Sequence, residues 1–496
     1  MREQPNAAPR GTSWSPPEGW EAVIGLEVHA QLATDSKLFS SAPHAFGASP
    51  NSQTTEVDLG LPGVLPAINR RAVELAVRAA LALGCELQRE SLFARKHYFY
   101  PDLPKGYQIS QYERPFALGG GVPIESGGQA RTIELTRIHL EEDAGKSIHD
   151  PAVTGGGVTH VDLNRAGVPL IEIVSEPQIR GPAEAGAYLR SLRSLLRYLD
   201  ACSGDMEKGC FRCDANVSVR RSGEERLGTR TELKNLNSFR FVEKAIEFEI
   251  ERQIELIEDG GAVVQQTRGW DERAGRSYEM RTKEQAEDYR YFPDPDLPPL
   301  ALDEEWIERL RAGLPELPGS RRARYVADWG LSEEVARVLT EEREVADFFE
   351  RLVADYPDAK SASGWVARDV LELRAAAGRS LVELPLEPRA LAALLRLVDA
   401  GRVSPASGRE ILAELAARGG DPEKIMLERG LEAVADSGEL AGLAREVLAA
   451  HPRQVEQYRS GQQKLFNFFV GQMMKATRGK ASPPVVQQVL RETLDE

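Results

Sequence analysis

Glu27 and His29 are the first residues in the chain whose types and spacing could support chemistry. They lie in the stretch VIGLEVHAQL at positions 23–32, where apolar residues alternate with glycine and polar ones. This alternation predicts a half-buried β-strand, and side chains two residues apart on a strand point to the same side. A carboxylate and an imidazole on one face can reach one cation or one substrate. A lone exposed pair of this kind most often has no function, so the assignment needs other segments.

Two later segments supply further carboxylates. The stretch LTRIHLEEDAGKSIHD places Glu141 and Glu142 behind a predicted strand, and VPLIEIVSEP places Glu172 between two isoleucines. A carboxylate flanked by aliphatic residues in a strand should have a partner, because burying it unpaired is costly. Carboxylates with an imidazole and no cysteine suit Mg²⁺ or Mn²⁺. These residues therefore predict a divalent cation site.

Two more polar surfaces are candidates for ligand binding. In CDANVSV the outward residues of a predicted strand, Asp214, Asn216 and Ser218, could line a cleft. The stretch TELKNLNSFRF brings Lys234 to a helix N-terminus, where anion binding and ordinary capping are equally good explanations.

Several familiar motifs are excluded. AGKS (144–147) looks like the end of a P-loop, but the residue five before Gly145 is Leu140 instead of glycine. No GxGxxG follows a predicted strand, which excludes a Rossmann site. Cys210 and Cys213 form a CxxC without a second pair, so Cys213 is expected to be a core residue.

The elements that must position these residues form a mixed region followed by a helical one. The predicted strands are 22–32, 132–140, 169–174, 213–219 and 230–233, and the predicted helices are 70–83 and 239–258. Strands and helices without regular alternation favour an α+β fold. The proline-rich YFPDPDLPPL (291–300) is the best domain boundary, and helical periodicity follows it.

Composition narrows the class of protein. A chain of 496 residues exceeds one hydrophobic core, and no apolar run is long enough to cross a membrane. Four cysteines do not form a disulfide framework, so a reducing cytoplasm is expected. A net charge of −15 argues against nucleic-acid binding by the whole surface. Between 451 and 480, however, six basic residues face only Glu456, which allows a local phosphate-contacting surface.

Taken together, these stretches resemble the B subunits of the tRNA-dependent amidotransferases, the GatB family. The matching segments are VIGLEVHAQL, LGLPGVLPAIN, RKHYFYPDLPKGYQISQ, HLEEDAGKS, VDLNRAGVPLIEIVSEP, RCDANVSVR, ELKNLNSF and DYRYFPDPDLPPL. The segment GQQKLFNFFVGQMMKATRGKASPPVV looks like the family's YqeY-type tail. The resemblance extends from about residue 20 to the end.

The resemblance implies an α+β fold with a catalytic cradle of the glutamine synthetase and guanido kinase type, built on an antiparallel sheet. The implied domains are a flexible leader (1–19), the cradle (20–297), an all-α helical domain (298–425) and a YqeY-like tRNA-binding tail (426–496).

The activity implied by the resemblance has two steps and needs ATP and Mg²⁺. ATP phosphorylates the side-chain carboxylate of Glu-tRNA(Gln) or Asp-tRNA(Asn), and ammonia then displaces the phosphate. The implied partners are a glutaminase (amidase) subunit, which supplies ammonia through a channel, a small third subunit, and the misacylated tRNA. A free-standing ATP-dependent carboxylate–amine ligase and a non-catalytic tRNA-binding scaffold are the alternatives.

The resemblance also assigns roles to individual residues. Glu27, His29, Glu142 and Glu172 match the family's metal and channel-mouth positions. Glu142 looks like the channel mouth, where it would accept the ammonium proton, and Lys96 matches a position lining the channel. Glu142, Glu172 and Lys96 are therefore the expected catalytic residues.

Strand parity gives a different orientation for one of these carboxylates. Period-two alternation from Ile138 and Leu140 turns Glu142 inward and Glu141 outward with His139, unless a bulge reverses it.

Two further expectations concern tRNA and zinc. The basic residues expected to contact tRNA in the tail are Lys464, Lys475, Arg478 and Lys480. Many relatives carry two cysteine pairs for zinc after SKLF and before LGLPG. Here SKLFSSAP and TTEVDLGLPG contain no cysteine, so no zinc is expected and this loop must be held by its own packing.

Overall fold

The computed structural model describes residues 14–149, 151–282, 289–433, 437–477, 481 and 483–495. Residues 1–13 of the predicted leader lie outside these ranges. The chain divides into two compact units, Met1–Leu317 and Pro318–Glu496.

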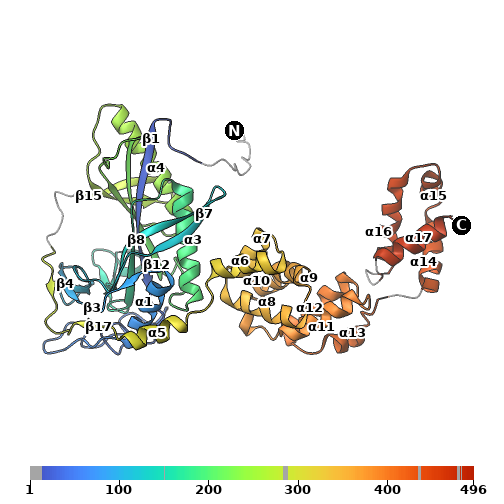
Figure 1. The fold of residues 1–496 in the computed structure, drawn as a ribbon, viewed down its shortest axis with the longest axis horizontal. Coiled ribbons are helices and arrows are strands. Elements are labelled where there is room, and N and C mark those ends of the chain that lie inside the picture. The colour runs from blue at the N-terminus through green and yellow to red at the C-terminus, as the bar shows by residue number, and fades with distance from the viewer. Residues whose placement is uncertain are drawn as a thin grey trace. The chain divides into compact units, whose positions relative to one another are not determined.

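A 13-stranded mixed sheet forms the framework of the first unit (Figure 1). Its strands run in the order β15-β14-β13-β12-β1-β11-β8-β5-β4-β16. In addition, β6 and β7 pair with β8, and β2 pairs with β6. The strands of the unit are β1 (Trp20–Gln31), β2 (Glu86–Leu87), β3 (Glu90–Ser91), β4 (Ala94–His97), β5 (Tyr107–Ser110), β6 (Ala117–Leu118), β7 (Gly121–Ser126), β8 (Gln129–Glu142), β9 (Lys146–Ile148), β10 (His160–Asp162), β11 (Pro169–Ser175), β12 (Phe211–Arg221), β13 (Thr231–Lys234), β14 (Gln266–Asp271), β15 (Arg276–Thr282), β16 (Phe292–Pro293) and β17 (Leu300–Ala301).

The sheet differs in one respect from the antiparallel sheet expected from the sequence. β13 and β14 are parallel, whereas the other pairs are antiparallel. Helix α4 (Phe239–Glu258) connects these two strands. A crossover helix returns the chain in its original direction, and the next strand can then pair in parallel.

The side chains of β1 alternate between an apolar face and a polar face of the sheet. Ile24, Leu26, Val28 and Ala30 are 0% exposed, while Glu27, His29 and their same-face neighbours Gly25 and Gln31 are partly exposed. This is the alternation expected from VIGLEVHAQL, and it confirms the predicted strand. The predicted segments at 132–140, 169–174, 213–219 and 230–233 are likewise strands, β8, β11, β12 and β13.

Helices cover the apolar face. They are α1 (Arg70–Ala82), α3 (Pro182–Tyr198) and α4, while α2 (Pro151–Thr154) is a short turn between β9 and β10, and α5 (Glu304–Ala312) closes the unit. The side chain of Asn69 caps α1 by accepting from the N–H groups of Arg71 and Ala72, and that of Ser238 caps α4. The two predicted helices are therefore confirmed, with α1 ending one residue early.

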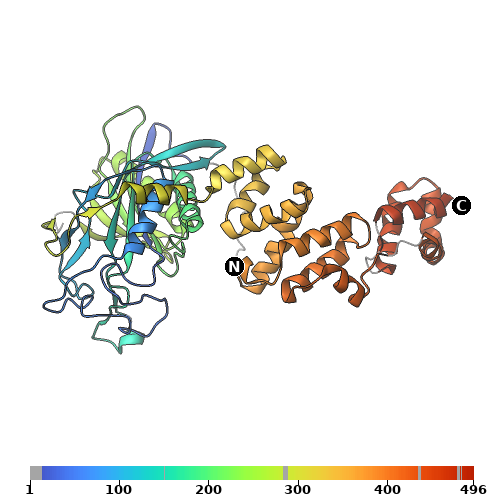
Figure 2. The same ribbon diagram turned by 60° about the horizontal axis from the view of Figure 1, so that its bottom comes forward.

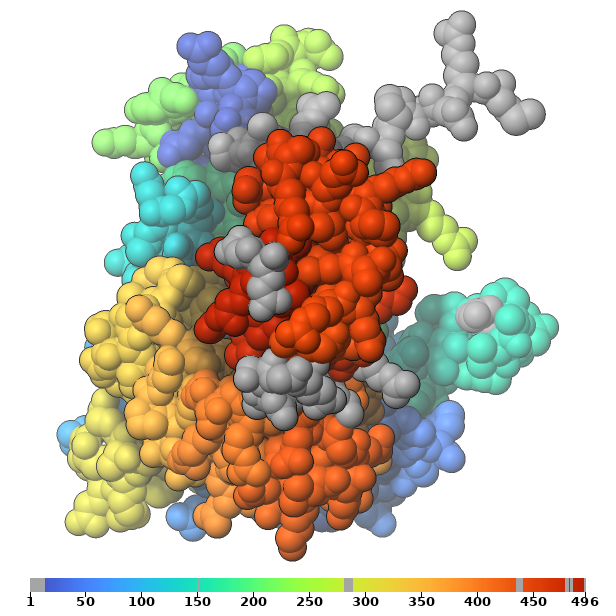
Figure 3. Space-filling view, turned by 90° about the vertical axis from the view of Figure 1, so that its right-hand side faces the viewer, coloured from blue at the N-terminus to red at the C-terminus, as the bar shows by residue number. Residues whose placement is uncertain are grey.

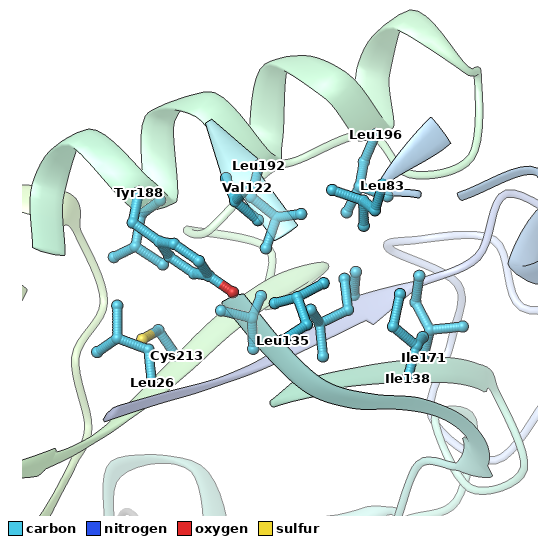
Figure 4. Close-up of a cluster of buried hydrophobic side chains, with 14 of the residues drawn as sticks. Leu26, Leu83, Val122, Leu135, Ile138, Ile171, Tyr188, Leu192, Leu196 and Cys213 are labelled. Carbon is cyan, nitrogen blue, oxygen red and sulfur yellow. The ribbon is translucent and has the colours of Figure 1, made fainter. Parts of the chain in front are cut away.

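Side chains of α3 fill the space above the sheet (Figure 4). Tyr188, Leu192 and Leu196 point from the helix toward β-strand residues that include Leu26, Ile138 and Ile171. Cys213 is 2% exposed among them, which confirms its expected place in the core. Each fully buried side chain of this size stabilises the fold by about 1.5–3 kcal/mol, so the polar face of the sheet rests on a rigid support.

The second unit is helical (Figure 2). Its helices are α6 (Pro318–Trp329), α7 (Glu333–Thr340), α8 (Arg343–Asp355), α9 (Ala359–Gly364), a π-helical turn (Trp365–Val370), α10 (Leu371–Ala377), α11 (Pro388–Asp399), α12 (Pro405–Arg418), α13 (Pro422–Arg429), α14 (Ser437–Ala450), α15 (Pro452–Arg459), α16 (Phe466–Ala476) and α17 (Pro483–Asp495), with 3₁₀ turns at Leu381–Glu383 and Gln463–Leu465. Two hydrophobic clusters stabilise it. One is formed by residues from Tyr325 to Leu431, and the other by residues from Leu440 to Leu494. The red surface in Figure 3 belongs to the helices of the second cluster.

The fold class is α+β, as predicted. Across the described ranges, no helix combines the length and the apolar character needed to cross a membrane.

Candidate active site

Four strands of the first unit bring polar side chains together on the open face of the sheet. In the central pairings, His29 on β1 lies opposite Glu172 on β11 and opposite Arg212 on β12. Glu172 in turn lies opposite His139 on β8. Directly opposed residues of neighbouring strands share a face, so these four side chains are adjacent.

His29, Glu141 and Glu172 form the centre of this group. His29 Nε2 lies 3.2 Å from Glu172 Oε2 and 3.5 Å from Glu141 Oε1. One ligand atom from each residue falls within 4.8 Å of the others, an arrangement that could hold a metal ion. His139 is the fourth member, with its Nε2 3.4 Å from Glu172 Oε2. We refer to His29, His139, Glu141 and Glu172 as the His–Glu cluster.

The electrostatics of the cluster follow from burial and these short contacts. Burial disfavours a charged imidazole, but the hydrogen bond and charge of Glu172 outweigh it and raise the pKa of His29 to about 9. The pKa of His139 is raised in the same way, against burial, by Glu172 and Glu141. Burial alone would raise the pKa of Glu172, yet the two histidines hold it well below its usual range. The positive charges of the protonated imidazoles thus balance the negative charges of the carboxylates.

Glu27 lies next to the cluster but is held by different groups. The side-chain amide of Asn216 donates to Glu27 Oε1 at 2.9 Å. Burial, followed by the charges of Glu172, Asp214 and Glu232, raises the pKa of Glu27. Glu27 also lines a cavity of about 280 Å³ between β1, β11 and β12. The carboxylate therefore stands between the His–Glu cluster and an adjoining open space.

Glu142 has a separate set of contacts. Its Oε1 accepts hydrogen bonds from the ammonium group of Lys105 and, at 2.9 Å, from the main-chain N–H of Ile109. The side chain is 3% exposed. The structure thus groups Glu141, and not Glu142, with His29 and Glu172, in agreement with the strand parity from Ile138 and Leu140.

Lys96 lies among aromatic rings near the cluster. Its Nζ is 4.8 Å from the ring centre of Tyr289 and 6.0 Å from that of Tyr98. Burial would lower the pKa of Lys96. Electrostatic interactions outweigh this effect and raise the pKa; they come from Glu141, Tyr291, Tyr289 and Glu172. The lysine therefore stays charged in a partly aromatic environment.

The loop without cysteines is held by a buried ion pair. Lys37 Nζ lies 3.5 Å from Asp58 Oδ2, and the two side chains are 0% and 3% exposed. Asp58 also accepts from the hydroxyl group of Ser40 and from the main-chain N–H of Thr55. Packing and these polar contacts order the loop.

The expected tRNA-contacting residues are described only in part. Lys464 lies in the 3₁₀ turn at Gln463–Leu465 and Lys475 in α16, and both are exposed. Arg478 and Lys480 lie outside the described residues.

Several members of the site do not stand out in the sequence. Strand parity predicts that His139 and Glu141 lie on the polar face but gives neither a role. The motifs RKHYFYPDLPKGYQISQ and RCDANVSVR contain Lys105 and Arg212 without assigning either residue a role. The pattern RCDANVSV does put Arg212 on the outward side with Asp214, and this signal could have identified it.

The fold and the site together define an α+β protein whose sheet carries a carboxylate–imidazole cluster suited to a divalent cation. Residues 22–308 match the family model described as the GatB/GatE catalytic domain, and residues 347–494 match the GatB domain. The chain belongs to the GatB/GatE family, which confirms the resemblance seen in the motifs.

Curated relatives are similar over nearly the whole chain. A protein of Alkalilimnicola ehrlichii is 54% identical over 478 residues, covering 96% of this chain and 99% of the relative. Proteins of Geobacter sulfurreducens and Geobacillus thermodenitrificans are 53% and 50% identical with the same coverage. Each of the three is named as the B subunit of aspartyl/glutamyl-tRNA(Asn/Gln) amidotransferase.

Proposed function

We propose that this chain is the B subunit of an ATP-dependent tRNA amidotransferase that converts Glu-tRNA(Gln), Asp-tRNA(Asn) or both to the amide forms. The observation that carries the proposal is the identity of 50–54% over 96% of the chain to relatives of that name. The cluster of cation-type ligands on the sheet of the matched catalytic domain supports it.

The chemistry requires activation of a carboxylate. A side-chain carboxylate oxygen attacks the γ-phosphorus of ATP, the bond from that phosphorus to the bridging oxygen breaks, and ADP leaves. Ammonia then attacks the carbonyl carbon, the carbon–oxygen bond to the phosphate breaks, and hydrogen phosphate leaves with one proton from the nitrogen. Without the phosphate, the carboxylate oxygen would be too poor a leaving group.

The donor set of the His–Glu cluster fits Mg²⁺. Glu141 and Glu172 supply hard oxygen ligands and His29 supplies Nε2. The raised pKa of His29 means that its ring would have to give up a proton to hold a cation, because the neutral ring is the ligand. Mg²⁺ bound there supplies positive charge for phosphoryl oxygens. We propose that Glu27, whose pKa is raised by burial and by surrounding carboxylates, also contributes to this site, directly or through water.

Glu142 and Lys96 are proposed to act on ammonia. The buried Glu142 carboxylate is fixed by Lys105 and the Ile109 N–H, and a fixed carboxylate is a suitable acceptor for an ammonium proton. Lys96 and the tyrosines around it offer polar atoms that can guide a small polar molecule. In this proposal a separate glutaminase subunit supplies the ammonia, and a small third subunit completes the heterotrimer.

The remaining expectations also stand as proposals. They are a cradle of the glutamine synthetase and guanido kinase type, a cytoplasmic location, no zinc in the Lys37–Asp58 loop, and domains predicted at 20–297, 298–425 and 426–496. The first compact unit extends beyond the predicted end of the cradle, to Leu317, and its core includes Leu302 and Ile307. The separate hydrophobic clusters at 325–431 and 440–494 support a helical domain and a distinct tail, but they favour a boundary after Leu431, because α13 and Met426 belong to the first cluster. The exposed Lys464 and Lys475 support a tRNA-binding tail.

The test is reconstitution of the complete complex. The chain is purified with its glutaminase and small partner subunits and given ATP, Mg²⁺, glutamine and each misacylated tRNA. Conversion of the tRNA-bound acid to its amide is expected for at least one tRNA. If neither acid becomes an amide, the proposal is wrong, and amide formation on a free acid would favour the free-standing ligase.

A further inference from the structure

Arg212 is a cation beside the His–Glu cluster that has no role so far. It belongs to the outward face of β12, the polar surface that continues through Asp214 to Ser218. Its position in the sheet is directly opposite His29. The side chain is 34% exposed, so it is accessible from the open face.

A buried carboxylate orients this guanidinium. Arg212 Nη2 lies 3.0 Å from Asp143 Oδ1, and the Asp143 side chain is 5% exposed. The amide of Gln31 donates to the other oxygen, Oδ2, at 3.1 Å, and Arg165 Nε lies 3.6 Å from the same oxygen. Asp143 is therefore fixed from two further sides, and it constrains the direction of the arginine side chain.

The guanidinium keeps donors for a ligand. It carries five N–H groups, and in the described part of the chain its ion-pair partner is Asp143 through Nη2. Burial would lower the pKa of Arg212, but Asp143, Glu141 and Asp214 raise it, so the group is always charged. An oriented, accessible guanidinium beside a cation site is well suited to an anion with several oxygens.

We propose that Arg212 binds the phosphoryl group in transit between ATP and the side-chain carboxylate of the aminoacyl-tRNA. This inference rests on the proposed function. The phosphoryl oxygens carry the charge of the transferring group, and the planar fork of arginine can donate two parallel hydrogen bonds to them. Arg212 makes no covalent bond: the phosphorus–oxygen bond to ADP breaks, the bond to the carboxylate oxygen forms, and the arginine contacts only the non-bridging oxygens.

The test compares three variants in the complete complex with both partner subunits. Arg212→Gln removes the charge, and Arg212→Lys keeps it but loses the planar fork. Arg220→Gln is the matched control, because Arg220 lies on the outward face of the same strand and is held by Glu21 at 2.7 Å, away from the cluster. Amide formation is measured with ammonium chloride in place of glutamine, so that the glutaminase step does not contribute.

The expected result for Arg212→Gln is a loss of roughly 10²–10³-fold in kcat, the usual cost of one donor to a developing charge. Arg212→Lys should recover only part of this loss, and Arg220→Gln should stay within about twofold of the unmodified complex. The KM for misacylated tRNA should change little. A kcat within about twofold for Arg212→Gln, or a loss confined to tRNA affinity, overturns the inference.

Binding of a non-hydrolysable ATP analogue with Mg²⁺, measured by calorimetry without tRNA, separates the two sources of the phosphoryl group. Weaker analogue binding by Arg212→Gln places Arg212 on the ATP phosphates. Unchanged analogue binding with reduced kcat places it on the phosphorylated carboxylate.

The same measurement separates this inference from the proposed function. If the unmodified complex binds the analogue and Arg212→Gln weakens that binding, but no amide forms on any tRNA, Arg212 still contacts the ATP phosphates, whereas the proposed function, and with it transfer to the tRNA-bound carboxylate, fails. If amide forms and Arg212→Gln changes neither kcat nor analogue binding, the function stands and the inference fails. If the unmodified complex neither binds the analogue nor forms amide, both fail.

Discussion

His29 Nε2 and Glu172 Oε2 lie 3.2 Å apart across the central strand pair β1 and β11, where the two residues are directly opposed. The contact raises the pKa of the imidazole to about 9 and holds that of the carboxylate well below its usual range. At neutral pH the pair is therefore fully charged, with a proton where a metal ion would otherwise bind. The first prediction removes the carboxylate of this pair.

Glu172→Gln should weaken binding of Mn²⁺, a spectroscopic substitute for Mg²⁺, by at least about tenfold, because it removes a charged ligand. Calorimetry or electron paramagnetic resonance on the complete complex measures the affinity. Glu134→Gln is the control, since Glu134 is an exposed carboxylate on neighbouring β8. Equal Mn²⁺ affinity in the two variants would contradict the assignment.

Glu141 and Glu142 are adjacent in sequence, but their substitutions should have different effects. Glu141→Gln should weaken Mn²⁺ binding because Glu141 belongs to the His–Glu cluster. Glu142→Gln should leave Mn²⁺ affinity unchanged and reduce amide formation from glutamine-derived ammonia by roughly 10²-fold or more, if Glu142 accepts the ammonium proton. The glutamine side chain can still accept from the Ile109 N–H, so the local fold should persist. Normal use of glutamine by Glu142→Gln would refute its role at the channel.

The buried Lys37–Asp58 pair should be important for stability of the first unit. Asp58→Ala leaves the Lys37 ammonium buried without its carboxylate, and breaking such a pair costs about 3–5 kcal/mol. Hydrogen–deuterium exchange of the β1 amides during urea unfolding measures this loss within the unit. Glu56→Ala, which removes an exposed carboxylate from the same loop, should change the free energy of unfolding by less than about 0.5 kcal/mol. Equal effects of the two substitutions would show that the ion pair contributes nothing specific.

Glu350 should make the stability of the second unit depend on acid pH. Although burial opposes it, hydrogen bonds from Arg321 and Arg324 lower the pKa of Glu350 from 4.5 to about 2. A lowered pKa stabilises the folded state above the unfolded value of about 4.5, and this contribution is lost as pH falls toward about 2.

Glu350→Gln should therefore destabilise the unit by roughly 1–2 kcal/mol at pH 7, since the carboxylate is partly exposed and its pairing is screened. The difference from the unmodified chain should shrink steadily below pH 4.5. Urea unfolding of the full chain across this pH range tests it. Glu410→Gln, at an exposed position of the same unit, is the control, and a difference that grows at low pH would reverse the expected sign.

Lys464 and Lys475 should contribute to tRNA affinity by binding phosphates. Replacing both with alanine should weaken binding and reduce the slope of log K against log salt by about 0.7–0.9 for each phosphate that is no longer neutralised. Lys424→Ala, which removes an exposed lysine of α13, should leave the slope unchanged. A double variant with the same slope as the unmodified complex would exclude both lysines from the interface.

Local pattern predicted much of the first unit. The alternation in VIGLEVHAQL defines β1 and its polar face, and the Ser238 cap marks the start of α4. The parallel pairing of β13 with β14 was not predictable, because strand direction depends on where the crossover helix returns the chain. Periodicity within one segment carries no information on that geometry.

Features of the candidate site that lie within a single strand were predictable from the sequence, whereas contacts between strands were not. Strand parity correctly predicted that Glu141 lies on the polar face. The flanking isoleucines correctly predicted that Glu172 lies in a strand. The contact between Asp143 and Arg212 depends on the alignment of β12 beside β1 and on the end of β8. Such long-range register is set by packing of the whole sheet, so no local pattern predicts it.

The His–Glu cluster draws its members from three strands that are distant in sequence and adjacent in the sheet. Its ligands come within reach of one another only after β8, β11 and β1 have paired, and such non-local pairings form slowly because their loops must close first. A nascent or partly folded chain therefore has no preformed place to sequester a divalent cation. Cation affinity should consequently appear at the end of folding, together with the completed central sheet.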